Sequence, residues 1–527
     1  MKLNEMPFFF FDLQTTGAKP ESGAAILEMA WTSSDGKTEA SLIQLPNEEK
    51  IPYRIQMITG IFNDDMVAAN PADQVFADLE EKFKSHRCII HFAQFEKPFL
   101  AHQYSQWNKE FPFEILCTHE IAKRLFPNLP TRGIKGLAGY FGYPSQDLKR
   151  AAQQTEATKA IWDGLLAELS KQGIETWDQL QEWLNVTPKV SRTKYEYPLQ
   201  KEKRLTLPDQ PGIYRMISKW DEILYVGKAT SLKDRVNSYF RGQKNRDSRK
   251  LEMLTQVYDL RVTVCGSPLE AALLETDEIK KWDPRYNISL KAGHRNVVFF
   301  NHEMTDIDYE QSEEFCIGPF SSSLVFDSIR NLRECLVAGK FHDNVFYEPI
   351  DATLVEEGFK VFCERNSLSA ETFKSVRNML ALGLWWNRQF ELLEDDEDTL
   401  EDDVQAEFVS DVSAEEVEEL IELTAVDIAD KIERHIMRAG RTYLRAKELT
   451  RILNADISYK PADSEIEMPY QIKVRAGYIA SEANKERVPK VSLWNGLNID
   501  TYDRMSVLLM ELGKIRTQEG FVEIQYR

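Results

Sequence analysis

The sequence lacks the features that mark membrane proteins, secreted proteins and zinc-finger proteins. Its longest apolar runs, such as residues 7–11 and 297–300, fall far below the roughly 20 residues that cross a bilayer. The first residues contain no small-residue cleavage site of a signal peptide. Six cysteines are spread over 527 residues without a CxxC pair, which excludes a disulfide framework and a cysteine zinc site. We therefore expect a cytoplasmic protein with no membrane partner.

Basic residues are also in the minority. The chain has 65 Lys and Arg against 85 Asp and Glu, a net charge of −20, which argues against a protein that coats nucleic acid along its whole length. Residues 201–295 reverse this balance with 19 basic and 13 acidic side chains, so a local basic site is compatible with the composition. Residues 391–422 hold 16 acidic and no basic residues, which indicates a solvated linker.

The length and the patterning predict several domains. At roughly 100–200 residues per domain, three or four are expected. The first 185 residues alternate short apolar runs with amphipathic stretches, which favours an α/β layer domain. We divide the chain into an α/β domain at 1–185, a linker at 186–206, a second domain at 207–295, its continuation at 296–390, an acidic linker at 391–422 and a helical C-terminal domain of unknown role at 423–527.

The second domain begins with a predicted hairpin. Strand-like runs at 212–217 and 223–226 flank a polar turn. A helix is expected from about Ser231, and an apolar helix is expected at 269–282. The hairpin can bring one tyrosine from each strand into one shallow site.

The side chains of this domain suit the cleavage of a phosphodiester. Tyr214 and Tyr225 lie on the two predicted strands, and Lys228 and Arg235 can supply cations to a phosphate. Glu275, an acid within an apolar helix run, can be a hard oxygen ligand for a divalent ion. A metal with two nearby cations stabilises the charge that cleavage develops. Each of these residues alone also has an ordinary structural explanation.

The pattern PGIY…YVGK…LKDRVNSYF…ALLE…PRYN over about 208–291 resembles the GIY-YIG nucleases. The match is closest to the N-terminal nuclease of UvrC and to the shorter Cho endonuclease, and GPF at 318–320 resembles a fainter continuation. The resemblance implies a metal-dependent endonuclease that hydrolyses DNA. The catalytic positions of the family fall on Tyr214, Tyr225, Lys228, Arg235, Tyr239, Glu275 and Asn287.

The resemblance also implies a role for each residue. Glu275 would hold one Mg²⁺ or Mn²⁺. Tyr214 would take the proton from the attacking water, with Lys228 and the metal lowering a phenol pKa that is otherwise near 10. Arg235 would stabilise the cleaved phosphate. The family also implies that Tyr225 and Tyr239 orient water and substrate, and that Asn287 holds the walls of the site together.

The opening FFDLQTTG resembles the first motif of the DEDD exonucleases, such as the ε subunit of DNA polymerase III. The segments ITGI at 58–61, HFAQFEKPFL at 91–100 and CTHEIAKRL at 117–125 extend the resemblance over about 7–170. It implies an RNase H-like α/β fold. Together with the rest of the chain, we expect an α/β and α+β multidomain protein with a mostly helical C-terminal region.

The metal-binding positions of this second resemblance are altered. The expected ligands fall on Asp12, Gln14, Glu96 and Gln154, and the expected general-base His falls on Lys149. Two Mg²⁺ ions held close together need about four carboxylates, so we expect this exonuclease site to be inactive. Glu156 could replace Gln154 after a shift in register, but two positions along a helix is about 200° around its axis.

Several functions remain open from the sequence. The leading hypothesis is an endonuclease that nicks damaged duplex DNA in nucleotide excision repair, with the UvrA/UvrB lesion-recognition complex as a partner. A second is a GIY-YIG nuclease of restriction, recombination or mobile elements. A third is a bifunctional exonuclease and endonuclease, and a fourth is a non-catalytic DNA-binding or scaffold protein.

Overall fold

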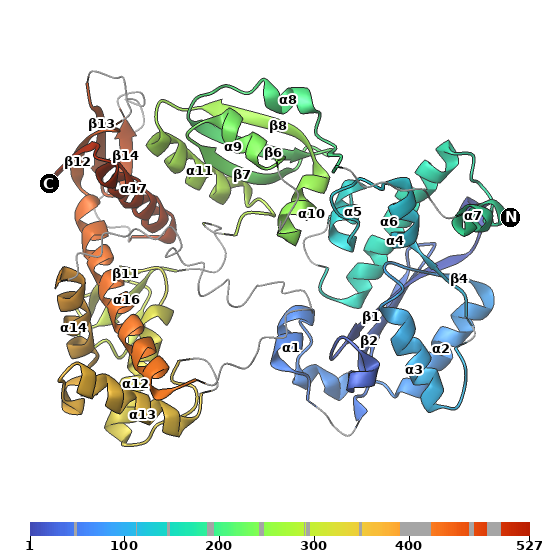
Figure 1. The fold of residues 1–527 in the computed structure, drawn as a ribbon, viewed down its shortest axis with the longest axis horizontal. Coiled ribbons are helices and arrows are strands. Elements are labelled where there is room, and N and C mark those ends of the chain that lie inside the picture. Colours follow the sequence, from blue (N-terminus) through green and yellow to red (C-terminus); the bar gives the residue numbers. More distant parts are fainter. Residues whose placement is uncertain are drawn as a thin grey trace.

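The computed structural model describes the whole chain except residues 47–49, 112, 145–147, 187–193, 242–246, 289, 291–295, 347–349, 390–422, 463–467 and 482–496. The acidic segment expected to be a linker, 391–422, lies outside the described residues. The described residues form four sheets, one in each of four units that follow one another along the chain (Figure 1). No helix among them has the length and apolar character that crossing a bilayer requires.

The first unit is a mixed sheet covered by helices on both faces. Its strands are β1 (Phe8–Thr15), β2 (Ile26–Ser33), β3 (Thr38–Leu42), β4 (Arg87–Ile90) and β5 (Ile115–Cys117), in the order β3-β2-β1-β4-β5. The pairs β1–β2 and β2–β3 are antiparallel, and β1–β4 and β4–β5 are parallel. The helices are η1 (Leu3–Glu5), η2 (Pro20–Ser22), α1 (Tyr53–Thr59), η4 (Asn63–Ala68), α2 (Ala72–Ser85), α3 (Glu96–Gln106), α4 (Thr118–Leu125), α5 (Ile134–Tyr140), α6 (Ala151–Lys171) and α7 (Trp177–Asn185).

The four phenylalanines of β1 explain why this strand is central. Phe8 and Phe10 enter the core that α4, α5 and α6 share, and Phe9 and Phe11 enter the core of α2 and α3. Successive side chains of a strand point to opposite faces, so four buried phenylalanines in a row need helices on both sides. The α/β layer expected from the alternating pattern is confirmed.

The second unit is the predicted hairpin with one more strand and four helices. Its strands β6 (Gly212–Ser218), β7 (Ile223–Ala229) and β8 (Val257–Val264) form an antiparallel sheet in the order β7-β6-β8. Its helices are α8 (Lys201–Leu205), α9 (Leu232–Ser238), α10 (Ser248–Gln256) and α11 (Pro268–Trp282). Ser231 caps α9, because its side chain accepts the N–H of Asp234.

Residues 197–205 were expected to belong to a linker at 186–206, but they are packed against the second unit. Leu199 is buried in the core of the second unit, Tyr197 packs against that core, and α8 follows directly. The apolar side chains at 197 and 199 are spaced by two, a signal that is easily lost among the basic residues around them. Residues 197–205 therefore belong to the second unit.

The third and fourth units are joined by one long helix. The third unit contains β9 (Val298–Asn301), β10 (Ile307–Asp308), β11 (Phe315–Phe320), α12 (Leu324–Ala338), α13 (Ala352–Arg365), η5 (Ala370–Lys374), α14 (Val376–Gln389) and most of α16 (Ala425–Ile452). The fourth contains β12 (Ala455–Lys460), β13 (Tyr470–Arg475), β14 (Tyr478–Ser481), α17 (Ile499–Thr517) and β15 (Phe521–Tyr526). The C-terminal region is largely helical, as expected, but its four-stranded antiparallel sheet, in the order β14-β13-β12-β15, was not predicted.

Glycine allows α14 and α16 to cross at close range. A Cβ at Gly440 of α16 would lie 2.6 Å from the carbonyl carbon of Gly383 on α14, inside any real contact distance. Glycine within a helix costs about 1 kcal/mol relative to alanine, and the close helix contact offsets that cost here. Residues on both sides of the acidic segment thus share one core.

Two helix contacts join the second unit to its neighbours (Figure 1). On one side α5 packs on α10, where a Cβ at Gly139 would overlap the side chain of Gln256. The N–H of Thr131 also donates to Thr255 Oγ1 at 3.2 Å. On the other side α11 packs along α17.

Candidate active sites

Three tyrosines meet at the centre of the second unit. Tyr214 lies on β6, Tyr225 lies on β7, and Tyr239 directly follows α9. The hydroxyls of Tyr214 and Tyr239 are 2.9 Å apart, and the three ring centroids are 6.0–6.3 Å from one another. Gly227 lies opposite Tyr214 in the strand register, and a Cβ there would lie 2.4 Å from the Tyr214 hydroxyl oxygen. The glycine of the YVGK motif therefore leaves the space that this hydroxyl occupies.

Arg235 supplies positive charge beside the tyrosines. Its guanidinium lies 5.6 Å from the ring centroid of Tyr239 and favours the ionised form of Tyr214. Burial nevertheless raises the pKa of Tyr214 well above its usual value, and Tyr225 and Tyr239 add to the rise. The surroundings therefore disfavour loss of the Tyr214 proton, and further positive charge in the site would oppose that effect.

Lys228 was expected to supply that charge, but its ammonium is paired with a carboxylate of the C-terminal unit. Its Nζ lies 2.5 Å from Oε1 of Glu511, on α17 of the C-terminal unit. The ammonium thus has a carboxylate as its partner, and the effect of Lys228 on the pKa of Tyr214 stays a prediction. No local pattern could have shown this pair, since its two residues are 283 positions apart.

Glu275 is a half-buried carboxylate on α11, at the edge of β7. Its Oε1 accepts the backbone N–H of Lys228 at 2.9 Å. Burial raises the pKa of Glu275 to about 7, against the opposing effect of Lys228. Glu275 also lies close enough to raise the pKa of Tyr225. The helix therefore places one acidic side chain beside the tyrosines, as the sequence predicted.

The donor set at Glu275 fits a single divalent ion. A carboxylate with one oxygen held by an N–H keeps lone pairs for a hard cation, and Mg²⁺ is commonly bound by one or two carboxylates with several waters. In the part of the chain that the structure describes, no three His, Cys, Asp or Glu side chains gather into a metal cluster. A site of this kind would therefore take most of its ligands from water.

Asn287 makes two hydrogen bonds that hold the free edge of β7. Its Oδ1 accepts the N–H of Val226 at 3.0 Å, and its Nδ2 donates to the carbonyl of Val226 at 2.9 Å. The side chain is buried and pairs with β7 as another strand would. Asn287 therefore fixes the strand that carries Tyr225 and Lys228.

The first unit has a cavity of roughly 500 Å³ at the end of its central strand. Asp12, Glu96 and Gln154 line this cavity, together with His91, Phe92, Phe95, His119 and residues 130–134. Burial raises the pKa of Asp12 well above its usual value, with contributions from Glu96 and Glu28, and burial raises the pKa of Glu96 to about 8. The structure thus brings together three of the four residues expected at the altered exonuclease site.

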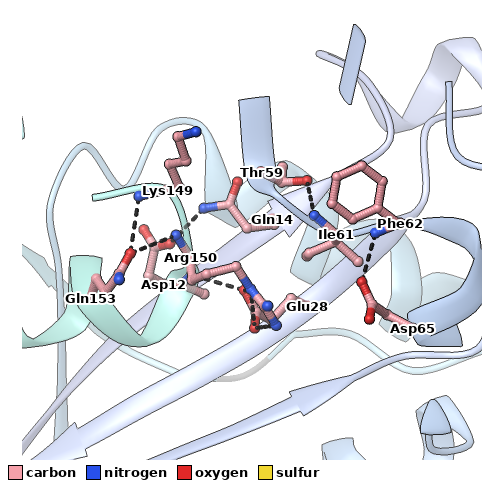
Figure 2. A network of polar contacts seen from close by, with 11 residues as sticks. Asp12, Gln14, Glu28, Thr59, Ile61, Phe62, Asp65, Lys149, Arg150 and Gln153 are labelled. Atoms are coloured by element: carbon pink, nitrogen blue, oxygen red, sulfur yellow. Dashed lines mark hydrogen bonds and ion pairs between the residues drawn. The ribbon is translucent and has the colours of Figure 1, made fainter. Parts of the chain in front are cut away.

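An ion pair beside this cavity was not predicted. Glu28 lies opposite Gln14 in the β1–β2 register, so its side chain is on the same face as Asp12. It accepts two hydrogen bonds from Arg150, with Nε at 3.0 Å and Nη2 at 2.5 Å, and one from the N–H of Ala151 at 2.9 Å (Figure 2). The sequence carried a signal for it, since Glu28 is the only charged residue within the apolar strand ILEMAW.

These residues do not fit a pair of metal ions. Among the described residues that line the cavity, Asp12 and Glu96 alone carry carboxylates. Gln14 donates weakly to Asp12 Oδ2 at 3.5 Å, and the carboxylate of Glu28 is occupied by Arg150. Arg150 thus removes Glu28 from the acids that could hold a metal ion.

Glu156 and Lys149 do not repair the site. Glu156 accepts hydrogen bonds from Tyr143 and Thr38 at 3.0 and 3.1 Å on the solvent side of α6, and it does not line the cavity. The backbone N–H of Lys149 donates to Gln153 Oε1, in the turn before α6 (Figure 2). The replacement of Gln154 by Glu156 that the sequence left open is therefore not seen.

Comparisons with known proteins match the two units separately. The family model described as "UvrC-like GIY-YIG domain" matches residues 210–288, and the model described as "Exonuclease" matches residues 9–161. A protein of Mycobacterium tuberculosis (strain CDC 1551 / Oshkosh), named as a candidate bifunctional exonuclease/endonuclease, is 29% identical over 308 residues, 56% of this chain and 46% of that protein.

Two further relatives cover the GIY-YIG region. The UvrABC system protein C of Clostridioides difficile (strain 630) is 45% identical over 85 residues, 16% of this chain and 14% of that protein. The crystal structure of the N-terminal endonuclease domain of UvrC from Thermotoga maritima, bound to its catalytic magnesium, is 31% identical and covers 17% of this chain and 94% of that one, with a TM-score of 0.15. The alignments with the two curated relatives span less than half the length of each. The chain therefore carries an exonuclease-family domain at 9–161, followed at 210–288 by a UvrC-like GIY-YIG domain.

Proposed function

We propose that this protein is a DNA endonuclease whose reaction centre is the GIY-YIG unit. The observation that carries the proposal is the convergence of three tyrosines, Arg235 and the half-buried carboxylate of Glu275 on one side of a small sheet. A phosphodiester resists hydrolysis because the attacking and the leaving oxygen both need charge stabilisation. The cluster offers that stabilisation together with hydroxyls that can orient water.

Each residue has a task in this reaction. Glu275 would hold Mg²⁺ or Mn²⁺, which supplies Lewis-acid stabilisation of the phosphate charge when it is bound. Arg235 binds the phosphate oxygens from the α9 side. Tyr214, in its ionised form, accepts the proton of the attacking water and becomes a neutral phenol. Tyr239 holds the Tyr214 oxygen in place through the hydrogen bond between them. Tyr225 orients water and substrate from β7.

The substrate that we propose is damaged duplex DNA, nicked as a step of nucleotide excision repair. The match to the UvrC-like model over residues 210–288 supports this proposal, as does the 45% identity over 85 residues to a UvrABC system protein C. The partner would be the UvrA/UvrB lesion-recognition complex. The alternative is that the protein is a GIY-YIG nuclease of restriction, recombination or mobile elements, which would use the same chemistry.

Incision of a defined duplex tests this proposal. A duplex with one bulky lesion and its undamaged counterpart are incubated with the protein and Mg²⁺, with and without UvrA and UvrB. Nicking of only the damaged duplex, and only with UvrA and UvrB, is the expected result. Nicking of undamaged DNA by the protein alone would instead indicate a nuclease of restriction, recombination or mobile elements. Binding without nicking in Mg²⁺ and in Mn²⁺ would leave a DNA-binding or scaffold protein.

A second candidate function is a bifunctional exonuclease and endonuclease. The name of the Mycobacterium tuberculosis relative favours it, and that alignment covers more than half of this chain. Asp12 and Glu96 still face a cavity that could admit a DNA 3′ end. Against it stand Gln14, Gln154 and the Arg150–Glu28 ion pair.

A variant without the endonuclease centre separates the two functions. With Glu275→Ala in place, end-labelled single-stranded and double-stranded DNA is followed in Mn²⁺. Because one metal ion cannot hold both the attacking and the leaving oxygen, we expect no 3′ shortening. Steady shortening that disappears when Asp12→Ala is added would show a working exonuclease and a bifunctional protein.

A further inference from the structure

The C-terminal unit reaches into the nuclease site through one side chain. Glu511 projects from α17, is 8% exposed, and places its Oε1 2.5 Å from Nζ of Lys228. The main-chain N–H of the same lysine is bound by Glu275. Lys228 is therefore fixed at both ends, by a carboxylate of α11 at its backbone and by a carboxylate of α17 at its ammonium.

Glu511 is itself held in place by a docked helix. Asp500 and Asp503 of α17 both bind Lys280 of α11, at 2.8 and 2.7 Å, and Arg504 binds Asp277 at 2.6 Å. These ion pairs link the first half of α17 to the last half of α11. The helix that carries Glu511 is thus held against α11, and Nζ of Lys514 on the same helix lies 3.8 Å from Oε1 of Glu511.

Apolar contacts hold the two units together as well. The first turns of α11 contribute Leu269 and Leu273 to the core of the C-terminal unit, where Met505, Leu508 and Leu512 of α17 also lie. In addition, Ser267 Oγ lies 2.9 Å from the hydroxyl of Tyr459. The two units therefore share a hydrophobic core, and their contact does not depend on the ion pairs alone.

We propose that Glu511 is a positioning residue of the nuclease, which presets the ammonium of Lys228 at the wall of the site. The proposal rests on the proposed function, since it concerns the phosphodiester cleavage that the GIY-YIG centre carries out. Lysine is a compact cation on a flexible four-carbon stem, and ordering it costs up to about 2 kcal/mol of rotamer entropy. A buried carboxylate that orders it before DNA arrives removes that cost from the reaction, and correct placement is worth large factors in rate.

The role gives the C-terminal unit a part in catalysis. The β12–β15 sheet and α17 form the scaffold that brings Glu511 to a site built 283 residues earlier in the chain. The GIY-YIG unit alone contains Lys228 but not the group that orders it. The complete nuclease site in this protein would thus need residues of two units.

The test compares four variants of the full chain in single-turnover nicking of duplex DNA. Glu511→Gln keeps the shape of the side chain and removes its charge, and the rate at saturating DNA should fall by about tenfold to a hundredfold. The DNA concentration for half-maximal rate should stay the same. Asp500→Asn is the matched control, because it removes an exposed ion pair of the same helix contact and leaves Lys280 paired with Asp503; its rate should stay within about twofold.

A cycle with Lys228 separates positioning from general structural support. In a Lys228→Met background, adding Glu511→Gln should cost less than about twofold, because the group to be positioned is gone. Full additivity of the two losses would overturn the proposal, and so would a rate that Glu511→Gln leaves unchanged. A faster Glu511→Gln enzyme would also overturn it and show that the contact restrains Lys228. Absence of nicking by the wild-type protein and the control would instead refute the proposed function, and with it this role.

Discussion

The ion pair between Arg150 and Glu28 should be the main support for the start of α6. Glu28 is almost fully buried, and Arg150 gives it two side-chain hydrogen bonds while keeping 37% of its own side chain exposed. In Arg150→Ala the carboxylate keeps the N–H of Ala151 and loses its counter-ion. Breaking a buried pair costs about 3–5 kcal/mol, and the exposed side of Arg150 points to the lower value, about 3 kcal/mol.

Hydrogen exchange measures this loss locally. About 3 kcal/mol corresponds to roughly a hundredfold faster opening of β2 and the first turn of α6, observed by exchange mass spectrometry on peptides that cover them. Lys159→Ala is the control, since it removes an exposed pair with Asp163 on the same helix and should cost at most about 0.5 kcal/mol. Adding Glu28→Gln to Arg150→Ala should restore part of the protection, because no buried charge remains. If Arg150→Ala exchanges no faster than the control, the pair is not the support that we infer.

Four further outcomes are expected. Glu275→Ala should abolish nicking in saturating Mg²⁺ with little change in DNA affinity, because the metal contributes several kcal/mol to the barrier; residual activity within about tenfold of wild type would remove Glu275 from the site. The Mg²⁺ concentration for half-maximal nicking should rise roughly tenfold from pH 8 to pH 6, because the metal needs the carboxylate and the pKa of Glu275 is raised to about 7 by burial; a flat profile would contradict this. Tyr214→Phe should slow nicking by about 10²–10⁴, and normal cutting by Tyr214→Phe together with loss in Tyr225→Phe would reverse the two assignments. Gly440→Ala should lower thermal stability, since its Cβ would meet the backbone of Gly383 at 2.6 Å; an unchanged melting temperature would show that the helices can separate without cost.

The GIY-YIG centre could be predicted because its parts lie on short, regular elements. A hairpin and a capped helix bring Tyr214, Tyr225 and Tyr239 together within 25 positions of sequence. The position of Glu275 could be predicted as well, because the apolar face of α11 must pack on the same sheet. Spacing within such elements is fixed by backbone geometry, so the motif carries three-dimensional information.

The partner of Lys228 could not be predicted in the same way. Glu511 lies on a helix whose charged residues look like an ordinary solvated face until α11 is placed against them. Glu28 is an intermediate case, since an acid inside an apolar strand signals a buried partner but does not say which. Contacts between distant segments depend on tertiary packing, which single-sequence periodicity does not contain.

The C-terminal sheet was missed for a different reason. In β12, Ala455, Ile457 and Tyr459 are buried while the residues between them are half-buried, the period-two pattern of a strand. Six residues of this pattern come directly after the 28-residue helix α16, whose strong helical periodicity dominates the region. The short alternating segment is recognised only once its partners β13 and β15 are seen beside it.

The packing of α5 on α10 determines how this protein can be divided into fragments. A Cβ at Gly139 would lie 1.7 Å from Gln256 Oε1, so the contact has no room for even a methyl group. Fragments separated between residues 186 and 196 would therefore expose the glycine face of α5 on one fragment and α10, which packs on it, on the other. Chimaeras that exchange the nuclease unit should take α5 and α10 from the same parent. A helix from another protein in place of α10 would need side chains that fit against Gly139 at the same short distance.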